Sequence, residues 1–144
     1  MGDARVAEPF AHTMRVRYAE CDALGVVFNA HYLTYLDQTM TELFRLGMGG
    51  YRRLIESELD MVVADVHMQF HAPARFDDEI VLEATVAHIG TTSLITHHRI
   101  RRDDELLLGA EMVHVWVRRG SARKTPIPNW ARDGLQPWYH PANG

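Results

Sequence analysis

The stretch ECDALGVVFNAHYLTYLDQ, residues 20–38, places an acid in a short loop just before a helical pattern of apolar side chains. Asp22 is followed by Gly25 and Asn29, and apolar residues then recur at the spacing of one helix face. This spacing predicts a helix over about residues 30–46, with Asn29 as its N-cap. A loop acid in this position either caps nearby amides or belongs to a site, and the rest of the chain bears on the choice.

Strand patterns dominate the chain after Leu59. Residues 61–71, MVVADVHMQFH, alternate between an apolar face and a mostly polar face, which is typical of a half-buried strand. Short connections at residues 90–92 and 103–104 indicate that the later strands form an antiparallel meander. The patterns predict strands over about residues 13–19, 61–71, 79–89, 93–102 and 105–119, and short helices at about 50–57 and 128–134.

The order of one strand, one helix and four further strands predicts an α+β fold, in which a long central helix is wrapped by an antiparallel five-stranded sheet. One helix covers only one face of such a sheet and leaves its edges open, so association with another copy is expected. We expect a single domain over residues 1–144, with an irregular lead-in over 1–12 and a proline-containing tail over 126–144.

Composition argues against several classes of function. A net charge of −4 gives no general reason to expect nucleic-acid binding, and no apolar run reaches the roughly 18 residues of a membrane helix. The sequence has no G-x-G-x-x-G motif, Walker A loop or G-x-S-x-G elbow, and no cofactor is expected. The N-terminus lacks a signal-peptide pattern, and Cys21 is the single cysteine, so a reducing cytoplasm is the expected location.

Nine histidines invite a metal-site interpretation, but their spacing is poor for shared ligation. His67 and His71 lie four apart in a strand pattern, which separates them by roughly 13 Å on one face. His97 and His98 point to opposite faces of a strand, so no metal site is expected. Cys21 could be a thiol nucleophile beside an acid, but no histidine is placed to activate it. A small, half-buried residue is the favoured interpretation.

Asp22 is the strongest candidate for chemistry. It is either a loop acid that hydrogen-bonds nearby amides, or a carboxylate that attacks a carbonyl or deprotonates a water molecule. The helix that follows has unpaired first amides, and its dipole favours negative charge at that end. A carbonyl oxygen placed there would be stabilised as it gains charge. Both parts of an acyl-transfer site are thus encoded between Asp22 and Asn29.

The segment DALGVVFNAHYL, residues 22–33, with YLD at 35–37, resembles the signature of hotdog-fold acyl-CoA thioesterases of the 4-hydroxybenzoyl-CoA thioesterase type. The order of the predicted elements is also similar to that of the family, over about residues 13–128. The resemblance implies a thioester hydrolase that acts on acyl-CoA and works as a homodimer or homotetramer.

The same resemblance implies roles for individual residues. Asp22 matches the catalytic nucleophile or general base, and Asn29 matches the position whose backbone amide polarises the thioester carbonyl. Gly25 matches a glycine that lets the loop pass close to the substrate, with a simple turn glycine as the alternative. Asp37 matches an acid common on the family's helix, and a solvated helical acid is the equal alternative. The turn and strand start that line a CoA channel across a subunit interface are matched by Thr91, Thr92 and Ser93.

Basic residues form two groups on the last two strands. The group at residues 99–102 lies nearer the turn of the predicted hairpin, whereas the group at 118–124 lies at its opposite end. The second group adjoins the CoA-binding end implied by the resemblance, so it is the better candidate for CoA phosphates. Ordinary solvated charge is the alternative for its members, among which the phosphate candidates are Arg118, Arg119 and Lys124.

The favoured interpretation is hydrolysis of a small-to-medium acyl-CoA to a free acid and CoA. A non-catalytic acyl-CoA-binding domain of the same fold is the first alternative, and it would have no need of Asp22. A hydratase is the second alternative. A hydratase would need an Asp/His pair to activate water. His31 lies at the predicted helix start, where it is not clearly placed to pair with Asp22.

Overall fold

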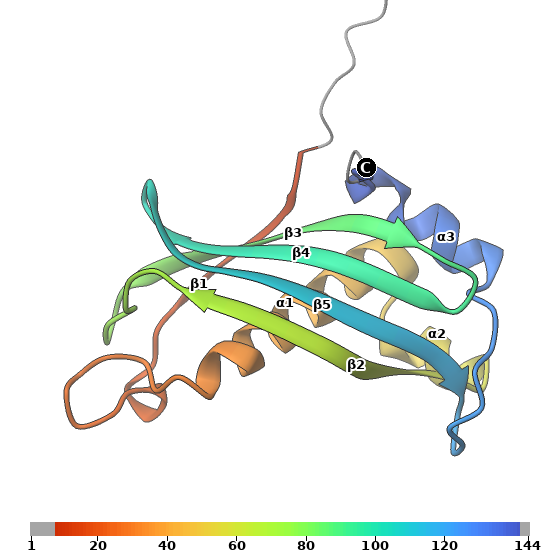
Figure 1. The fold of residues 1–144 in the computed structure, drawn as a ribbon, viewed down its shortest axis with the longest axis horizontal. Coiled ribbons are helices and arrows are strands. Elements are labelled where there is room, and N and C mark those ends of the chain that lie inside the picture. Colours follow the sequence, from red (N-terminus) through yellow and green to blue (C-terminus); the bar gives the residue numbers. More distant parts are fainter. Residues whose placement is uncertain (1–7, 142–144) are drawn as a thin grey trace, which may run out of the picture.

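The computed structural model describes residues 8–141 and shows α1 lying across one face of an antiparallel sheet (Figure 1). The expected central helix and five strands are present, which confirms the α+β class. The elements are β1 (Phe10–Arg15), α1 (His31–Met48), α2 (Tyr51–Glu56), β2 (Leu59–Phe70), β3 (Glu79–Ile89), β4 (Ser93–Arg102), β5 (Glu105–Arg118) and α3 (Asn129–Leu135), with 3-10 turns at Tyr18–Glu20 and Gln136–Trp138.

The helix α1 forms because buried side chains recur along it at three- and four-residue spacing, the pattern of one helix face. Its 18 residues make about five turns. The helix ends where Gly49 adopts a left-handed conformation with a φ of 79°, which glycine reaches without steric cost. The buried face consists of Tyr32, Tyr35, Leu36, Thr39, Met40, Leu43, Phe44 and Met48.

The strands follow the order β1-β3-β4-β5-β2. Only β3, β4 and β5 form a consecutive meander, so the expectation that all later strands are neighbours in chain order is wrong for β2. Instead β2 pairs antiparallel with β5, and residues 71–78 carry the chain to β3. This placement makes β2 an edge strand, on which Val62 and Val63 are each 46% exposed.

The first strand begins earlier than the predicted span of 13–19. It pairs with β3 from Phe10 onward, so the irregular lead-in predicted over residues 1–12 is wrong from Phe10, while residues 1–7 lie outside the described part. Phe10 is buried, and its ring meets the ring of Trp138 edge-on at 5.6 Å. Packing against the tail therefore supports the start of the strand, a contact that no local pattern reveals.

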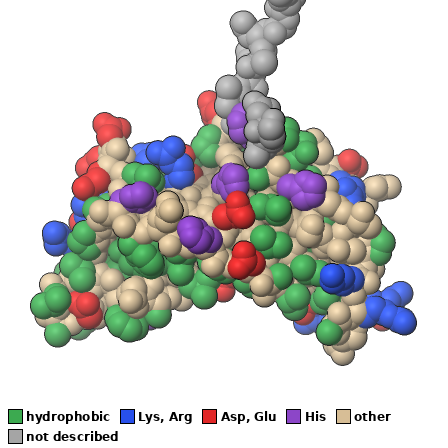
Figure 2. All heavy atoms as spheres, in the orientation of Figure 1, with side chains coloured by type: hydrophobic (Ala, Val, Ile, Leu, Met, Phe, Trp, Pro, Cys, Tyr) green, Lys and Arg blue, Asp and Glu red, His purple; other side chains and the backbone are tan. Residues whose placement is uncertain are grey.

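The two faces of the sheet differ in character. Apolar side chains of β3, β4 and β5 join α1 in one buried core, with Trp116 among the largest fully buried side chains. On the outer face, Figure 2 shows histidine and acidic side chains side by side near the middle of the sheet. There the Nε2 atom of His97 lies 3.0 Å from the Oε2 atom of Glu111.

Candidate active site

Asp22 lies in a tight loop that its own backbone helps to close. Its amide donates to the carbonyl of Val26 at 2.9 Å, and its carbonyl accepts from the amide of Gly25 at 3.0 Å. The Oδ1 atom accepts from the amide of Leu24 at 2.8 Å, as in an Asx-turn. Within the described residues Oδ2 has no partner, and the residue is exposed. The carboxylate is thus held by one oxygen and presents the other, and it does not cap α1.

Gly25 makes this loop possible. Its φ of +78° lies in the left-handed region, where a residue with a Cβ is strained. Its carbonyl accepts a hydrogen bond from the amide of Phe76 at 3.2 Å, which ties the loop to the segment between β2 and β3. The turn role is therefore visible directly, and an additional role in passing close to a substrate stays a prediction.

The start of α1 leaves backbone donors free. The helix begins at His31 and its N-cap position is Ala30, so the prediction that Asn29 is the N-cap is wrong. Residues here form a turn instead, in which the amide of His31 donates to the carbonyl of Phe28 at 2.9 Å. Among the described residues, the amides of Asn29 and Ala30 have no hydrogen-bond partner. These donors are available to a ligand oxygen at the positive end of the helix dipole.

Glu20, which the sequence interpretation passed over, anchors the loop to α1. It is only 4% exposed, and its carboxylate accepts from the guanidinium of Arg17 at 2.9 Å and the hydroxyl of Tyr35 at 2.9 Å. Burial acts to raise the pKa of Glu20, but these hydrogen bonds outweigh it and hold the pKa below its usual value. The available signal was Tyr35 on the apolar helix face, because a buried hydroxyl requires a partner.

A pocket of about 300 Å³ opens beside the start of α1. Its polar residues are Asn29 and His71, and its walls include the ring of Phe70, which meets Tyr32 edge-on at 5.4 Å. The strand spacing placed His71 on a sheet face, but β2 ends at Phe70 and the chain turns toward α1. The position of His71 depends on where β2 ends, and the spacing of residues along the strand does not reveal that end. The other lining residues are Val27, Ala72 and Pro73.

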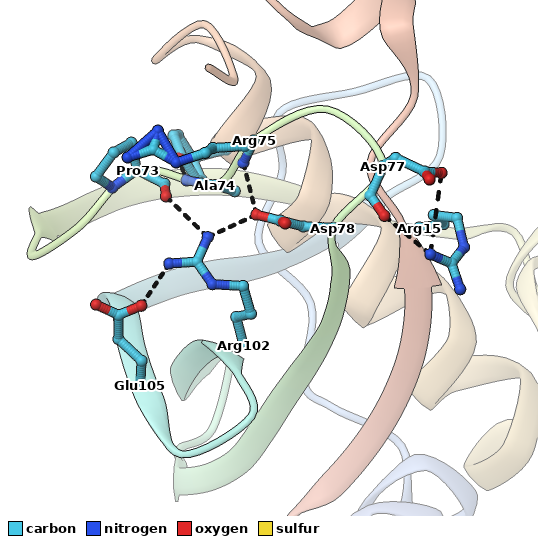
Figure 3. Close-up of polar contacts among 9 residues, drawn as sticks. Arg15, Pro73, Ala74, Arg75, Asp77, Asp78, Arg102 and Glu105 are labelled. Atoms are coloured by element: carbon cyan, nitrogen blue, oxygen red, sulfur yellow. Dashed lines mark hydrogen bonds and ion pairs between the residues drawn. The ribbon is translucent and has the colours of Figure 1, made fainter. Parts of the chain in front are cut away.

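Figure 3 shows how Arg102 fixes the segment that forms one wall of this pocket. Its guanidinium donates to the Oδ2 atom of Asp78 at 2.5 Å and to the carbonyl of Pro73 at 3.3 Å, and it also bonds Glu105. Asp78 in turn accepts from the amide of Arg75 at 2.8 Å. The guanidinium donors of Arg102 are therefore already used in hydrogen bonds to this segment and to Glu105, which leaves Arg102 poorly suited to binding a phosphate.

The two groups of basic residues differ in how they are paired. Arg101, like Arg102, is engaged, and it donates to Glu83 at 2.5 Å. Arg118 is exposed, and Arg119 only approaches Asp60, at 3.9 Å. In the first group only Arg99 is exposed without an ion-pair partner among the described residues, so the group at the end of β5 carries more free charge. A pocket of about 590 Å³ beside it is lined by Asp60, Val62, Val115, Val117, Gly120, Ser121, Ala122 and Lys124.

The β3–β4 turn lies at the same end of the sheet as this second group. The carbonyl of Thr92 accepts from the amide of Trp116, and the carbonyl of Thr91 from the amide of Ile127, each at 2.8 Å. The start of α1 lies at the other end of the sheet (Figure 1). One chain therefore forms two separate groups of predicted site residues: Asp22, Gly25 and Asn29, and Thr91, Thr92, Ser93, Arg118, Arg119 and Lys124.

The remaining candidates contribute little to this geometry. The thiol of Cys21 lies 3.7 Å from the carbonyl of Arg17, and burial together with nearby carboxylates raises its pKa, which disfavours the thiolate nucleophile. Asp37 is on the exposed side of α1. Between residues 8 and 141, no cluster of three or more His, Cys, Asp or Glu side chains is arranged to hold a metal ion. No helix in that same part of the chain is long and apolar enough to cross a membrane.

A helix laid across one face of a five-stranded antiparallel sheet, with the strand order β1-β3-β4-β5-β2, defines this molecule as a hotdog fold. Slr0204, a 1,4-dihydroxy-2-naphthoyl-CoA thioesterase from Synechocystis, shares the arrangement with a TM-score of 0.81. The match covers 89% of this chain and 96% of that one at 18% identity, a level at which the likeness shows the fold alone.

Sequence comparison places the chain in a family. Residues 24–116 match the thioesterase superfamily. The acyl-CoA thioester hydrolase YbgC of Escherichia coli O157:H7 is 31% identical over 91 residues, which are 63% of this chain and 68% of that protein. The acyl-CoA thioesterase YbgC of Haemophilus influenzae is 28% identical over 120 residues, 83% and 88% of the two chains. The chain belongs to the thioesterase superfamily and is a thioester hydrolase, which confirms the expected class of enzyme.

Proposed function

We propose that this enzyme hydrolyses an acyl-CoA to a free acid and CoA, with Asp22 as nucleophile or general base and the amide of Asn29 as oxyanion donor. The observation that carries the proposal is a pair of unsatisfied groups at one end of the fold. The Oδ2 atom of Asp22 and the backbone amide of Asn29 belong to exposed residues and have no partner among residues 8–141. The names of the YbgC relatives support acyl-CoA as the substrate class.

The chemistry follows from these two groups. The thioester oxygen accepts a hydrogen bond from the amide of Asn29, and the dipole of α1 stabilises the charge it gains. Asp22 either takes a proton from a water molecule whose oxygen attacks the carbonyl carbon, or attacks that carbon itself to form an anhydride that water then hydrolyses. In both routes the carbon–sulfur bond breaks, the thiolate of CoA leaves and is protonated, and the acid is released.

The second half of the site is proposed to come from another copy of the chain. The donors of Thr91 and the charges of Arg118 and Lys124 lie at the opposite end of the sheet from Asp22. The exposed edge of β2 offers a surface for joining two copies. A homodimer or homotetramer would then bring the basic end of one copy, which binds the CoA phosphates, to the Asp22 end of another.

The acyl group is proposed to occupy the pocket beside Asn29. At about 300 Å³ this pocket is at the small end of ligand sites, which supports a small-to-medium acyl group. Its aromatic and apolar walls accept either an aromatic ring or a short chain. A cytoplasmic location remains the proposed one, supported by the single cysteine.

A thiol-release assay over a panel of aliphatic and aromatic acyl-CoAs tests the proposal. We expect wild-type protein to release CoA from at least one small-to-medium member, and the Asp22→Asn variant to bind that substrate while releasing little thiol. Binding of CoA without thiol release from any member of the panel would contradict the proposal and support the non-catalytic binding domain.

A further inference from the structure

Arg132, in α3, lies against the β3–β4 turn. Its Nη2 atom donates to the carbonyl of Gly90 at 2.6 Å and to that of Thr91 at 3.4 Å. Its Nε atom donates to the carbonyl of Ile127 at 3.1 Å. One planar guanidinium therefore joins the turn to the segment that follows β5, and its fixed fork of donors sets the positions of the carbonyls.

We call these contacts of Arg132 the Arg132 clamp. They leave the carbonyls of the turn paired and two of its amides free. The carbonyls of Gly90 and Thr91 accept from Arg132, and those of Thr92 and Ser93 accept from backbone amides at 2.8 Å. In contrast, the amides of Thr91 and Thr92 have no partner within the described part of the chain. With its carbonyls engaged, the turn keeps two amide donors without a partner, on the exposed Thr91 and the half-buried Thr92, and successive free backbone amides of this kind form anion-binding turns.

The clamp is itself held firmly, because α3 is packed against α1. Gly134 approaches Gly47 so closely that a Cβ at position 134 would lie 2.3 Å from the carbonyl oxygen of Gly47. The ring of Trp130 also meets that of Trp116 edge-on, with centroids 6.3 Å apart. Arg132 is therefore fixed relative to both the helix and the sheet.

We infer that Arg132 is a positioning residue for CoA: by holding the carbonyls of Gly90 and Thr91 inward, it aims the amides of Thr91 and Thr92 at acceptor oxygens of the CoA moiety. The inference rests on the proposed function, in which CoA passes this turn. It accounts for binding at a turn that has a neutral threonine at position 91. The acceptor oxygens belong either to a phosphate or to the pantoyl carbonyl of pantetheine, both of which the N-acetylcysteamine thioester lacks and which share this chemistry.

The test uses the full-length variants Arg132→Met and Arg53→Met. Arg53 is a matched control, because its guanidinium lies 4.3 Å from the ring of Trp130 in the same α3. We expect Arg132→Met to raise KM for the preferred acyl-CoA roughly five- to tenfold, the effect of losing one or two positioned hydrogen bonds, with kcat within about twofold. The N-acetylcysteamine thioester of the same acyl group should show no change, and Arg53→Met should leave both substrates unaffected.

The pantetheine thioester distinguishes the two sources of the acceptor. A raised KM for it indicates a pantetheine carbonyl, and an unchanged KM indicates a phosphate. An unchanged KM for acyl-CoA in folded Arg132→Met, or an equal loss on the N-acetylcysteamine thioester, would overturn the inference. Arg132→Lys, which keeps the charge without the fork, should give an intermediate KM and serves if the methionine variant does not fold.

Calorimetry separates this inference from the proposed function. If wild-type protein releases no thiol from any acyl-CoA, the proposed hydrolysis fails. CoA binding would then still test Arg132, because Arg132→Met should weaken the binding of CoA itself by a similar factor. Equal CoA affinity in wild type and Arg132→Met would contradict the positioning role whatever the outcome for hydrolysis.

Discussion

The two ends of the sheet expose different chemistry. Before the start of α1, Asp22 presents a free carboxylate oxygen, and Asn29 presents a free amide beside a largely apolar pocket. At the other end, Thr91 and Thr92 of the β3–β4 turn have free amides, and residues 118–124 after β5 carry positive charge. The first end suits the bond that breaks, and the second suits the charged, polar carrier. Neither end of one chain holds both.

This separation has a kinetic consequence. Groups that act only on the transition state lower kcat when removed, whereas groups that bind the carrier equally in ground and transition states raise KM. Changes at the Asp22 end should therefore appear in kcat, and changes at the far end in KM. The contrast gives each end its own test.

The largest effect is expected from Asp22→Asn. Asparagine is nearly isosteric and its side-chain oxygen can still accept from the amide of Leu24, so the loop should survive. It is neither a useful base nor a nucleophile, so kcat should fall by roughly 10²–10⁴ with KM changed much less. Steady-state kinetics on the preferred acyl-CoA gives both constants.

Binding of a CoA analogue and the melting temperature are the controls for this variant, and both should stay close to wild type. If turnover survives with asparagine at position 22, the chemistry belongs to another acid, and Asp37 on α1 would be the next to replace.

Acid should affect both ends together, because they share one core. His98 and His114 are buried on the inner face of β4 and β5, and burial lowers the pKa of His98 to about 3 and that of His114 to about 4. In the unfolded chain both titrate near 6.5, so the unfolded state binds more protons in acid. Stability is therefore full above about pH 6.5 and should fall by about 2 kcal/mol per histidine between pH 6.5 and 4.5.

Denaturant titrations followed by circular dichroism across this pH range measure the loss. His114→Leu removes one of the two groups and should reduce the acid loss by about half. An unchanged slope in this variant would contradict the assignment of the loss to the buried histidines, because the lowered pKa of Glu20 affects stability only below about pH 4.5.

Local patterns predicted the secondary-structure elements better than the relation between them. Strands β3 and β4 have the predicted bounds, because turn residues flank their alternating patterns. The position of β2 beside β5 depends on pairing across the whole sheet, which no local pattern encodes. For the same reason His71 was assigned to a sheet face, and Glu20 was missed because its burial depends on Tyr35 from α1.

Mixing two defective variants tests whether the ends meet across copies. We expect Asp22→Asn protein and a triple variant, Arg118→Ala, Arg119→Ala and Lys124→Ala, to complement each other after subunits are exchanged. Half of randomly paired dimers are mixed, and each of these has one site with both intact halves, so about a quarter of wild-type activity should return at low substrate. Activity no higher than the average of the two variants would show that the two ends do not form one site across copies, as would a monomer in light scattering.

The smallest effect is expected from neutralising single residues at the far end. Arg118→Ala, Arg119→Ala or Lys124→Ala removes one exposed charge from a phosphate contact, so KM should rise roughly two- to fivefold at low salt with kcat unchanged. The rise should shrink above about 0.5 M salt, because exposed charges are then screened within a few ångströms. Arg101→Ala is the matched control: its guanidinium is already bound to Glu83 at the other end of the hairpin, so KM should not change. If the three variants keep the wild-type KM at low salt, or if the control variant raises KM equally, the CoA phosphates do not bind to residues 118–124.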